Sequence, residues 1–348
     1  MTEGSTIKRI DVPATFACLG SPVLWSLGPN FIKYLTGHVD LWTQNVLRYS
    51  VACLFWLPFL LFGLKTKRIE TNVWRRALLP SGANIAFQSL WAAAFYYVDP
   101  AFMVLLNKSS VIWIAGFSLI FFADERSLAR SRYFWGGLIL SMVGVIGVIY
   151  FKQDFAAYGT RMGIIIGLVT SLMWAAYTLS VKIAFRDIDS RNGFSVISIY
   201  TVVGLSVLGL LFGRLSDCLK MPAWPWACVV ISGVASIALS HVFYYTAIKR
   251  IGATVPALVV LAQPFAVFAI SHIVFGEILT GRQLLFGLVL LGGSALAIWA
   301  QQHLKRDSSI LRSSPDFSGA TAKDEWPATR ALPFGRKVVI PAPYHGTG

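Results

Sequence analysis

Ten long apolar stretches constrain the fold of this chain more than any other feature of its sequence. A helix that spans a bilayer needs about 20 mostly apolar residues, and each stretch is close to that length. Charged residues make up only 13% of the chain, whereas an ordinary soluble domain contains roughly 25%. The sequence therefore predicts an all-α integral membrane protein with ten transmembrane helices, over residues 13–34, 42–64, 77–98, 101–123, 133–151, 162–181, 192–213, 224–248, 253–276 and 283–303.

The second half of the chain repeats the pattern of the first half. Residues 95–145 correspond to residues 247–297, so that each position of the first segment matches the position 152 residues later. Glu125 thus corresponds to Glu277. Trp25 and Trp174 form another matching pair, since each is followed by a lysine eight residues later. Duplicated hydrophobic helices with a binding site between the copies are typical of secondary transporters.

Each copy contains five apolar stretches, and an odd number turns the second copy upside down in the membrane relative to the first. The sequence therefore predicts two inverted-topology repeats. The expected parts of the chain are a cytoplasmic N-terminal tail at residues 1–12, a first five-helix repeat at 13–151, a second five-helix repeat at 162–304, and a disordered cytoplasmic tail, rich in Ser, Pro, Gly and charged residues, at 305–348.

Positive charge is distributed unevenly between the two sides of the predicted membrane. If the N-terminus lies inside, most of the lysines and arginines between the helices also lie inside, and the outer segments contain only Lys152, Arg161, Arg214, Lys220 and Arg282. Basic segments stay on the cytoplasmic side, so both termini are expected in the cytoplasm, with a plasma or bacterial inner membrane as the location. The net charge of +14 then requires no nucleic-acid partner.

The duplicated five-helix unit resembles the EamA-type members of the drug/metabolite transporter superfamily. The resemblance extends over residues 15–302 and rests on the duplication together with matching helix ends. The residues that carry it are Trp25 with Lys33, Arg48–Tyr49, the segment 121–125, Gly136–Gly137 and Gly144 in the first half, and Trp174 with Lys182, Gly252, Gln263–Pro264 and Gly276–Glu277 in the second.

The resemblance implies ten helices around a central cavity, alternating access, and transport of small organic solutes, often outward; it does not specify the solute. One stretch departs from the family's pattern. The fourth stretch has the polar run Asn107–Ser110 at its core, where members of the family usually have apolar residues followed by a proline.

Lys108 is the main candidate for binding chemistry. It lies about two turns into the fourth apolar stretch, and a charge at the centre of a membrane helix costs at least about 2.5–3.5 kcal/mol. An ammonium group that binds a substrate carboxylate or phosphate would offset this cost. The alternative is that Lys108 extends outward to the membrane interface, and we prefer the binding interpretation because burial of the charge is so costly.

Two other stretches carry polar and aromatic side chains on one face. Asn84, Gln88 and Trp91 are spaced four and three residues apart, and His241 shares a face with Tyr244. We expect the two faces to meet between the repeats as a small-molecule pocket, with plain packing as an equal alternative. The complete candidate substrate site consists of Lys108, Asn107, Trp25, Asn84, Gln88, Trp91, Trp174, Tyr177, His241, Tyr244 and Gln263.

Ion coupling has few candidate residues, because Asp and Glu do not occur in the middle of any predicted helix. His241 could carry a proton, and a hydrogen-bonded structural histidine is the more ordinary alternative. Gln263–Pro264 is expected to interrupt the ninth helix, since proline removes a backbone hydrogen bond. Glu125 and Glu277 are expected to be helix-end residues near the membrane interface.

These observations favour a secondary transporter of a small anionic or zwitterionic metabolite, with export as one option. Efflux of amphipathic cations is the alternative, and the lack of mid-helix carboxylates counts against it. Clustered catalytic residues are not found, and the four cysteines include no CxxC pair, so enzyme activity, cofactors and metals are not expected. The expected partners are a solute and membrane lipid. Two GxxxG pairs suit packing within the monomer, and a homodimer is left open.

Overall fold

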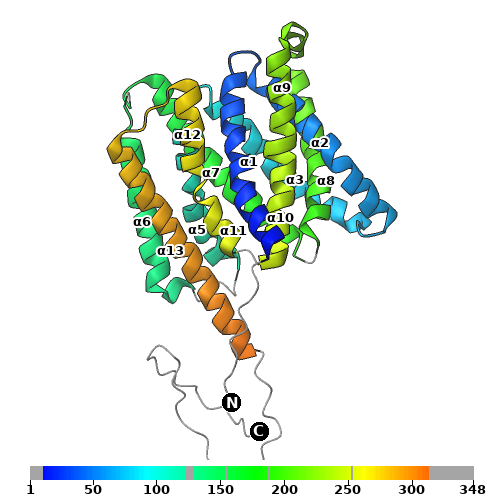
Figure 1. Cartoon of the computed structure of the whole chain (residues 1–348). Helices are drawn as coiled ribbons and strands as arrows, with labels where there is room; N and C mark the ends of the chain where they lie inside the picture. The colour runs from blue at the N-terminus through cyan, green and yellow to red at the C-terminus, as the bar shows by residue number, and fades with distance from the viewer. Residues whose placement is uncertain (1–10, 123–127, 154, 187, 252–253, 313–348) are drawn as a thin grey trace, which may run out of the picture. The chain divides into compact units, whose positions relative to one another are not determined.

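The computed structural model describes residues 11–122, 128–153, 155–186, 188–251 and 254–312, and each regular element within them is helical (Figure 1). The first half contains α1 (Val12–Leu35), α2 (Leu41–Lys65), α3 (Thr71–Ala94), α4 (Pro100–Lys108), α5 (Ser110–Phe121) and α6 (Arg132–Tyr150). The second half contains α7 (Tyr158–Ala184), α8 (Ser190–Phe212), the 3₁₀-helix η2 (Leu215–Lys220), α9 (Ala223–Ile231), the π-helix η3 (Ser232–Leu239), α10 (Ser240–Ile251), α11 (Thr254–Val260), α12 (Gln263–Phe275) and α13 (Gly281–Arg312).

Most helix boundaries lie within a few residues of the predicted ones, with two exceptions. α3 begins at Thr71, six residues before the predicted start. Its first turns are helical but consist largely of polar residues, so a search for apolar stretches does not find them. α13 continues to Arg312, where the sequence predicted disorder from residue 305. Because glycine and proline are absent from residues 294–314, no helix-breaking residue ends α13 at the predicted boundary.

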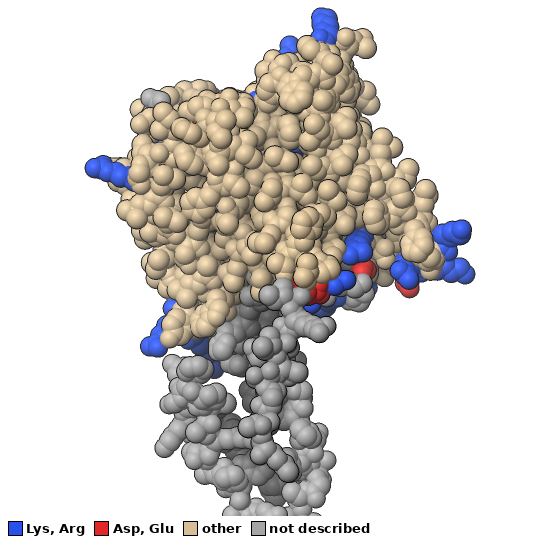
Figure 2. All heavy atoms as spheres, viewed as in Figure 1, with Lys and Arg blue, Asp and Glu red and all other residues tan. Residues whose placement is uncertain are grey.

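Eight of the helical segments in the described ranges are long and apolar enough to cross a membrane; α1 and α3 are not among them. Large apolar side chains lie uncovered on these segments, such as Ile273, which is 82% exposed, and Leu210, which is 73% exposed. A soluble monomer rarely exposes apolar surface on this scale. Figure 2 shows Lys and Arg at the edges of one face and a broad area without charged residues between them. The chain is therefore a multi-pass integral membrane protein, and the count of ten helices and the inverted topology stay predictions.

The two halves of the chain are interlocked. α1 packs against η3, α10, α11 and α12, which all belong to the second half, and Figure 1 shows it running between α12 and α10. α3 packs mainly against α7 and α8, and α2 against α8 and η3. Many side chains of the first half therefore face the second half, which is the arrangement needed for a site between repeats.

α6 and α13 approach each other so closely that small residues form their contact. A Cβ atom added to Gly144 would lie 2.4 Å from the backbone nitrogen of Leu290, and one added to Gly137 would lie 2.6 Å from that of Ala297. Small residues allow membrane helices to approach in this way. The two predicted GxxxG pairs also pack within the monomer, as expected: the pair at 163 and 167 faces residues 97–106, and the pair at 209 and 213 faces residues 42–46.

Asp40 connects the start of α2 to the segment that follows α8. Its Oδ1 accepts hydrogen bonds from the N–H groups of Trp42 and Thr43 at 2.9 and 3.0 Å, and its Oδ2 accepts one from the N–H of Arg214 at 2.9 Å. Burial acts to raise the pKa of the Asp40 carboxyl, but the hydrogen bonds together outweigh it and hold the pKa below the usual 3.8. The folded protein therefore favours the ionised carboxylate.

We expect Asp40→Ala to lower the free energy of unfolding by about 1–2 kcal/mol, the usual effect of removing a helix N-cap. Because the pKa of Asp40 is lower in the folded than in the unfolded protein, its stabilising effect is complete above about pH 4 and is lost as the pH falls through the folded-state pKa. Chemical unfolding in detergent at pH 7 and at lower pH measures the difference between wild type and variant. A difference that does not shrink in acid would contradict this assignment.

Candidate functional site

Two interrupted helices face each other at equivalent positions of the two repeats. In the first repeat α4 ends at Lys108 and α5 begins at Ser110, and in the second α11 ends at Val260 and α12 begins at Gln263. Lys108 and Val260 are 152 residues apart, which is the separation that relates the two repeats. Lys108 therefore contacts its own counterpart, and the contact lies where the two copies meet.

The ammonium group of Lys108 is held between the two interruptions. Its Nζ donates a hydrogen bond to the backbone oxygen of Val260 at 3.2 Å and another to Oε1 of Gln263 at 3.0 Å. The Val260 carbonyl is available because α11 ends there and leaves its last carbonyls without helical partners. Within the described ranges Lys108 forms no ion pair with a carboxylate. The described residues therefore offer Lys108 two uncharged acceptors and no counter-ion.

The interruption of the ninth predicted helix is confirmed, and Pro264 lies in the first turn of α12, where proline is tolerated because its missing N–H has no helical partner. The fourth predicted helix is also interrupted, although it has no internal proline. There the Ser109 hydroxyl lies 2.6 Å from the backbone oxygen of Leu106 and 3.0 Å from Oγ of Ser171. Such side-chain bonds to the backbone compete with helical hydrogen bonding.

α1 brings Trp25 to two aromatic candidates on α10. The ring centroids of Trp25 and His241 are 5.2 Å apart, and those of Trp25 and Tyr244 are 4.9 Å apart. His241 stacks on Phe194 at 4.4 Å, and its Nδ1 is hydrogen-bonded to the backbone oxygen of Ile237. The next residue on α1, Ser26, donates a hydrogen bond to the backbone oxygen of Gln263 at 3.5 Å, so α1 connects this group to Lys108.

The candidates on α3 and α7 form a separate group. Nε2 of Gln88 donates a hydrogen bond to Oδ1 of Asn84 at 3.3 Å, and Nδ2 of Asn84 donates one to Oγ1 of Thr201 on α8 at 3.0 Å. An aromatic row with successive centroid distances of 5.7, 5.0 and 5.6 Å is formed by Trp91, Phe87, Trp174 and Tyr177.

The expected direct meeting of the third and eighth predicted helices differs from the structure. α3 packs mainly against α7 and α8, whereas α10 packs against α1 and η3. Among the described elements, α10 also contacts α11 and α8. Asn107, beside Lys108, has a buried side-chain oxygen without a partner among the described residues.

Glu277 has a role that the sequence did not reveal. Gly276 adopts the left-handed conformation with φ 67° after α12, which glycine adopts without strain, and the chain then places Glu277 in a buried position with 4% exposure. Oε2 of Glu277 accepts a hydrogen bond from the N–H of Ala101 and Oε1 accepts one from Phe102, both at 3.0 Å. Glu277 thus caps α4, the helix that carries Lys108. Its counterpart Glu125 lies outside the described residues.

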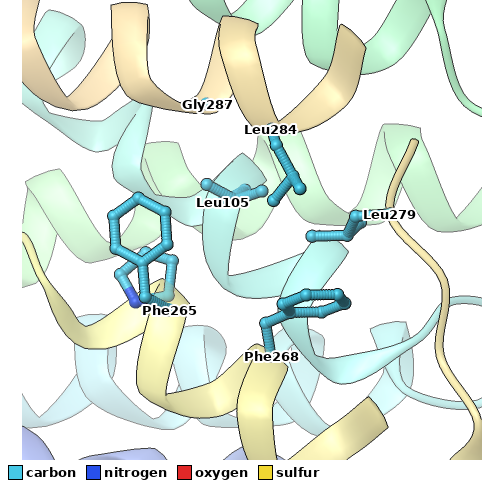
Figure 3. A pocket seen from close by; sticks show the side chains of 7 residues that line it. Leu105, Phe265, Phe268, Leu279, Leu284 and Gly287 are labelled. Carbon is cyan, nitrogen blue, oxygen red and sulfur yellow. The ribbon is translucent and has the colours of Figure 1, made fainter. Parts of the chain in front are cut away.

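A cavity of about 10 Å³ lies beside the start of α12, enough for roughly one water molecule. Figure 3 shows its apolar lining, which consists of Leu105, Pro264, Phe265, Phe268, Leu279, Leu284 and Gly287. A larger cavity of about 240 Å³ lies near the turn after α1 and is lined by Gly37, His38, Asp217, Lys220, Met221 and Pro222. Neither cavity is lined by a candidate substrate residue.

Comparison with known proteins agrees with a duplicated membrane transporter. The model of the EamA-like transporter family matches residues 12–150 and again residues 161–299. An uncharacterised transporter of Bacillus subtilis is 20% identical over 79% of this chain and 90% of its own length, and one of Archaeoglobus fulgidus is 26% identical over 76% and 92%. A biotin transporter of Salmonella typhimurium is 21% identical over 63% and 71%.

Solved structures support the fold. One crystal structure, of a protein 16% identical in sequence, has a TM-score of 0.57 and covers 84% of this chain and 98% of its own. Two family-model matches, one for each copy, account for most of the chain. The chain belongs to the EamA-like transporter family.

Proposed function

We propose that the chain is a secondary carrier that moves a small anionic or zwitterionic metabolite across the membrane by alternating access. The observation that carries the proposal is the position of Lys108 between the interrupted helices α4/α5 and α11/α12. In secondary transporters, substrate sites are formed by discontinuous helices near the middle of the membrane. Lys108 would bind the carboxylate or phosphate of the solute, with export as one direction of transport.

Charge supports this assignment. A lysine within a membrane segment is costly unless it meets water, a partner or a ligand, and the partners of Lys108 are two uncharged oxygens. A solute anion would supply the missing counter-ion. Lys108 contacts the amide of Gln263, and α1 connects Gln263 to the aromatic side chain of Trp25. Amide and aromatic side chains suit the non-ionic part of a small organic molecule.

Several relatives of this chain are named biotin transporters, and biotin carries a carboxylate. A carboxylate is the group that Lys108 would bind, so biotin belongs in the first set of solutes to be tested. At 21–22% identity the relatives suggest this chemistry, and the test must decide the solute.

The test combines thermal stability and transport. Purified wild type and Lys108→Gln would be heated in detergent with biotin, organic acids, sugar phosphates, amino acids and cationic drugs, and stabilising solutes would be assayed for exchange in proteoliposomes. A ligand at 100 times its Kd adds about 2.7 kcal/mol to the folded state. We expect an anionic or zwitterionic solute to stabilise wild type, and its exchange to fall at least tenfold in Lys108→Gln.

Lys220→Gln is the matched control, since Lys220 is exposed and lies in η2; it should bind and exchange the solute as wild type does. Equal stabilisation of wild type and Lys108→Gln by cations, without any effect of anions, would contradict the proposal and favour efflux of amphipathic cations. Flux that neither saturates nor accelerates with solute on the opposite side would indicate a channel.

A further inference from the structure

Arg48 is a buried cation for which the described residues provide no carboxylate. It is the eighth residue of α2, inside an apolar membrane segment, and is only 3% exposed. Its Nε donates a hydrogen bond to Oγ of Ser232 at 3.0 Å. Its Nη1 is buried and has no hydrogen-bond partner among the described residues, and those residues include no carboxylate that forms an ion pair with it.

The surroundings of Arg48 contain more unpaired polar atoms. Gln44 and Asn45 precede Arg48 by four and three residues, so they share its face of α2. Both are fully buried, and their side-chain carbonyl oxygens have no partner in the described chain. Their amide nitrogens are engaged elsewhere, with the Tyr96 hydroxyl and the backbone oxygen of Gln88. The two carbonyl oxygens are acceptors and Nη1 of Arg48 is a donor, so of these unpaired atoms only Nη1 of Arg48 can bind an anion.

The partner of Arg48 lies on unusual backbone. Ser232 is the first residue of the π-helix η3, which packs against both α1 and α2. The same π-helix carries Ser236, which lies close to Gly28 of α1 and whose buried hydroxyl has no partner in the part of the chain that the structure describes. Single π-turns occur frequently at functional sites. Arg48 and Ser236 therefore lie where η3 meets α2 and α1, and where the two halves of the chain meet.

We propose that Arg48 and Ser232 form a second oxyanion subsite, which binds a carboxylate group. A guanidinium can present parallel N–H donors to both oxygens of a carboxylate, and Nη1 of Arg48 has no partner among the described residues. The subsite rests on the proposed function in one respect, because it assigns a second anionic group to the same carrier. That group is either the other end of the solute that Lys108 binds or a separate anion.

The test uses full-length protein in detergent and thermal unfolding with succinate, acetate or sulfate, and with uncharged succinamide. The variants are Arg48→Lys, Arg48→Gln and Lys108→Gln, with Arg75→Gln at an exposed position of α3 as the matched control. Arg48→Lys keeps the charge that the fold accommodates and loses the paired donors, so it remains informative if Arg48→Gln does not fold. We expect each Arg48 variant that folds to bind carboxylates at least tenfold more weakly than wild type does. The affinity of Arg75→Gln should stay within twofold of that of wild type.

The outcomes separate the two sources of the anion and the two proposals. A preference for succinate over acetate that is lost in both Arg48→Lys and Lys108→Gln would mean that one solute spans both cations. Weaker acetate or sulfate binding in Arg48→Lys but not in Lys108→Gln would identify a separate anion, and would leave the role of Lys108 to the solute panel. Equal anion binding by wild type and Arg48→Lys, or no anion binding by wild type, would overturn the Arg48 subsite while exchange of an identified solute would still uphold the carrier.

Discussion

Replacing Gly144 by alanine is expected to destabilise the protein by about 3 kcal/mol, because the added methyl group has no space. Its carbon would lie 2.4 Å from the backbone nitrogen and 2.5 Å from the Cα of Leu290. Backbone atoms cannot turn aside as a flexible side chain does, so α6 and α13 must separate. Overpacking of this kind typically costs 1–3 kcal/mol, and the neighbouring contact at Gly137 would be loosened by the same separation.

Gly136→Ala is the matched control on the same helix. A Cβ atom at Gly136 would meet no atom within 4 Å, and alanine is favoured over glycine within a helix by roughly 0.5–1 kcal/mol. We therefore expect Gly136→Ala to be neutral or stabilising. Unfolding midpoints of the two variants in detergent would be compared with wild type. Equal effects at the two positions would show that the close contact of α6 with α13 does not contribute to stability.

Removing the carboxyl of Glu277 is the second change with a large expected effect. Glu277→Ala would leave the N–H groups of Ala101 and Phe102 buried without acceptors, and each unsatisfied group costs about 1–3 kcal/mol. We expect a loss of about 3 kcal/mol in the free energy of unfolding. Glu70→Ala is the control, since Glu70 also precedes a helix but is exposed and forms no capping hydrogen bond; its effect should stay within about 0.5 kcal/mol.

The same residue predicts a dependence on pH. Burial raises the pKa of the Glu277 carboxyl above its usual 4.5, although its hydrogen bonds with Ser271, Ala101 and Phe102 act in the opposite direction. A raised carboxyl pKa means that the folded protein binds the proton more tightly than the unfolded protein does. Stability from this group is therefore complete below about pH 4.5 and is lost as the pH rises through the folded-state pKa.

Glu277→Gln cannot titrate, so the stability of wild type relative to this variant should increase as the pH is lowered toward 4.5. Urea or heat unfolding of both proteins at several pH values measures the difference. A difference that is constant with pH would mean that the carboxyl of Glu277 does not change its pKa on folding.

The sequence predicted most of the helix boundaries and the family because both depend on local composition. A helix that crosses the membrane must be apolar along its length, so apolar stretches locate such helices in the sequence. Pro264 marked the interruption of the ninth helix. α3 began earlier than expected, since a helix end made of polar residues has no apolar signal. The interruption at Ser109 was not predicted, because a serine can bond to the backbone of its own helix without ending it, and its additional contact with Ser171 on α7 is not visible in the sequence.

Contacts between distant parts of the chain were not predictable from these patterns. Glu277 caps a helix end 176 residues earlier, and Arg48 meets Ser232 184 residues later. Periodicity describes the face of one helix and does not identify the helix that faces it. For that reason the candidate substrate residues were predicted as one pocket, whereas the structure divides them into groups on α1 with α10, on α3 with α7, and around Lys108.

The packing of α1 against the second half also has a consequence for biosynthesis. α1 ends at Leu35, and the first of its large second-half neighbours, η3, begins at Ser232. At about 5–20 residues per second, roughly 10–40 seconds of translation separate the two. During that interval the polar side chains of α1 that are buried in the finished protein, including Ser26 and Asn30, lack the second-half helices that cover them. We therefore expect α1 to lack most of its packing partners until the last third of the chain has been synthesised.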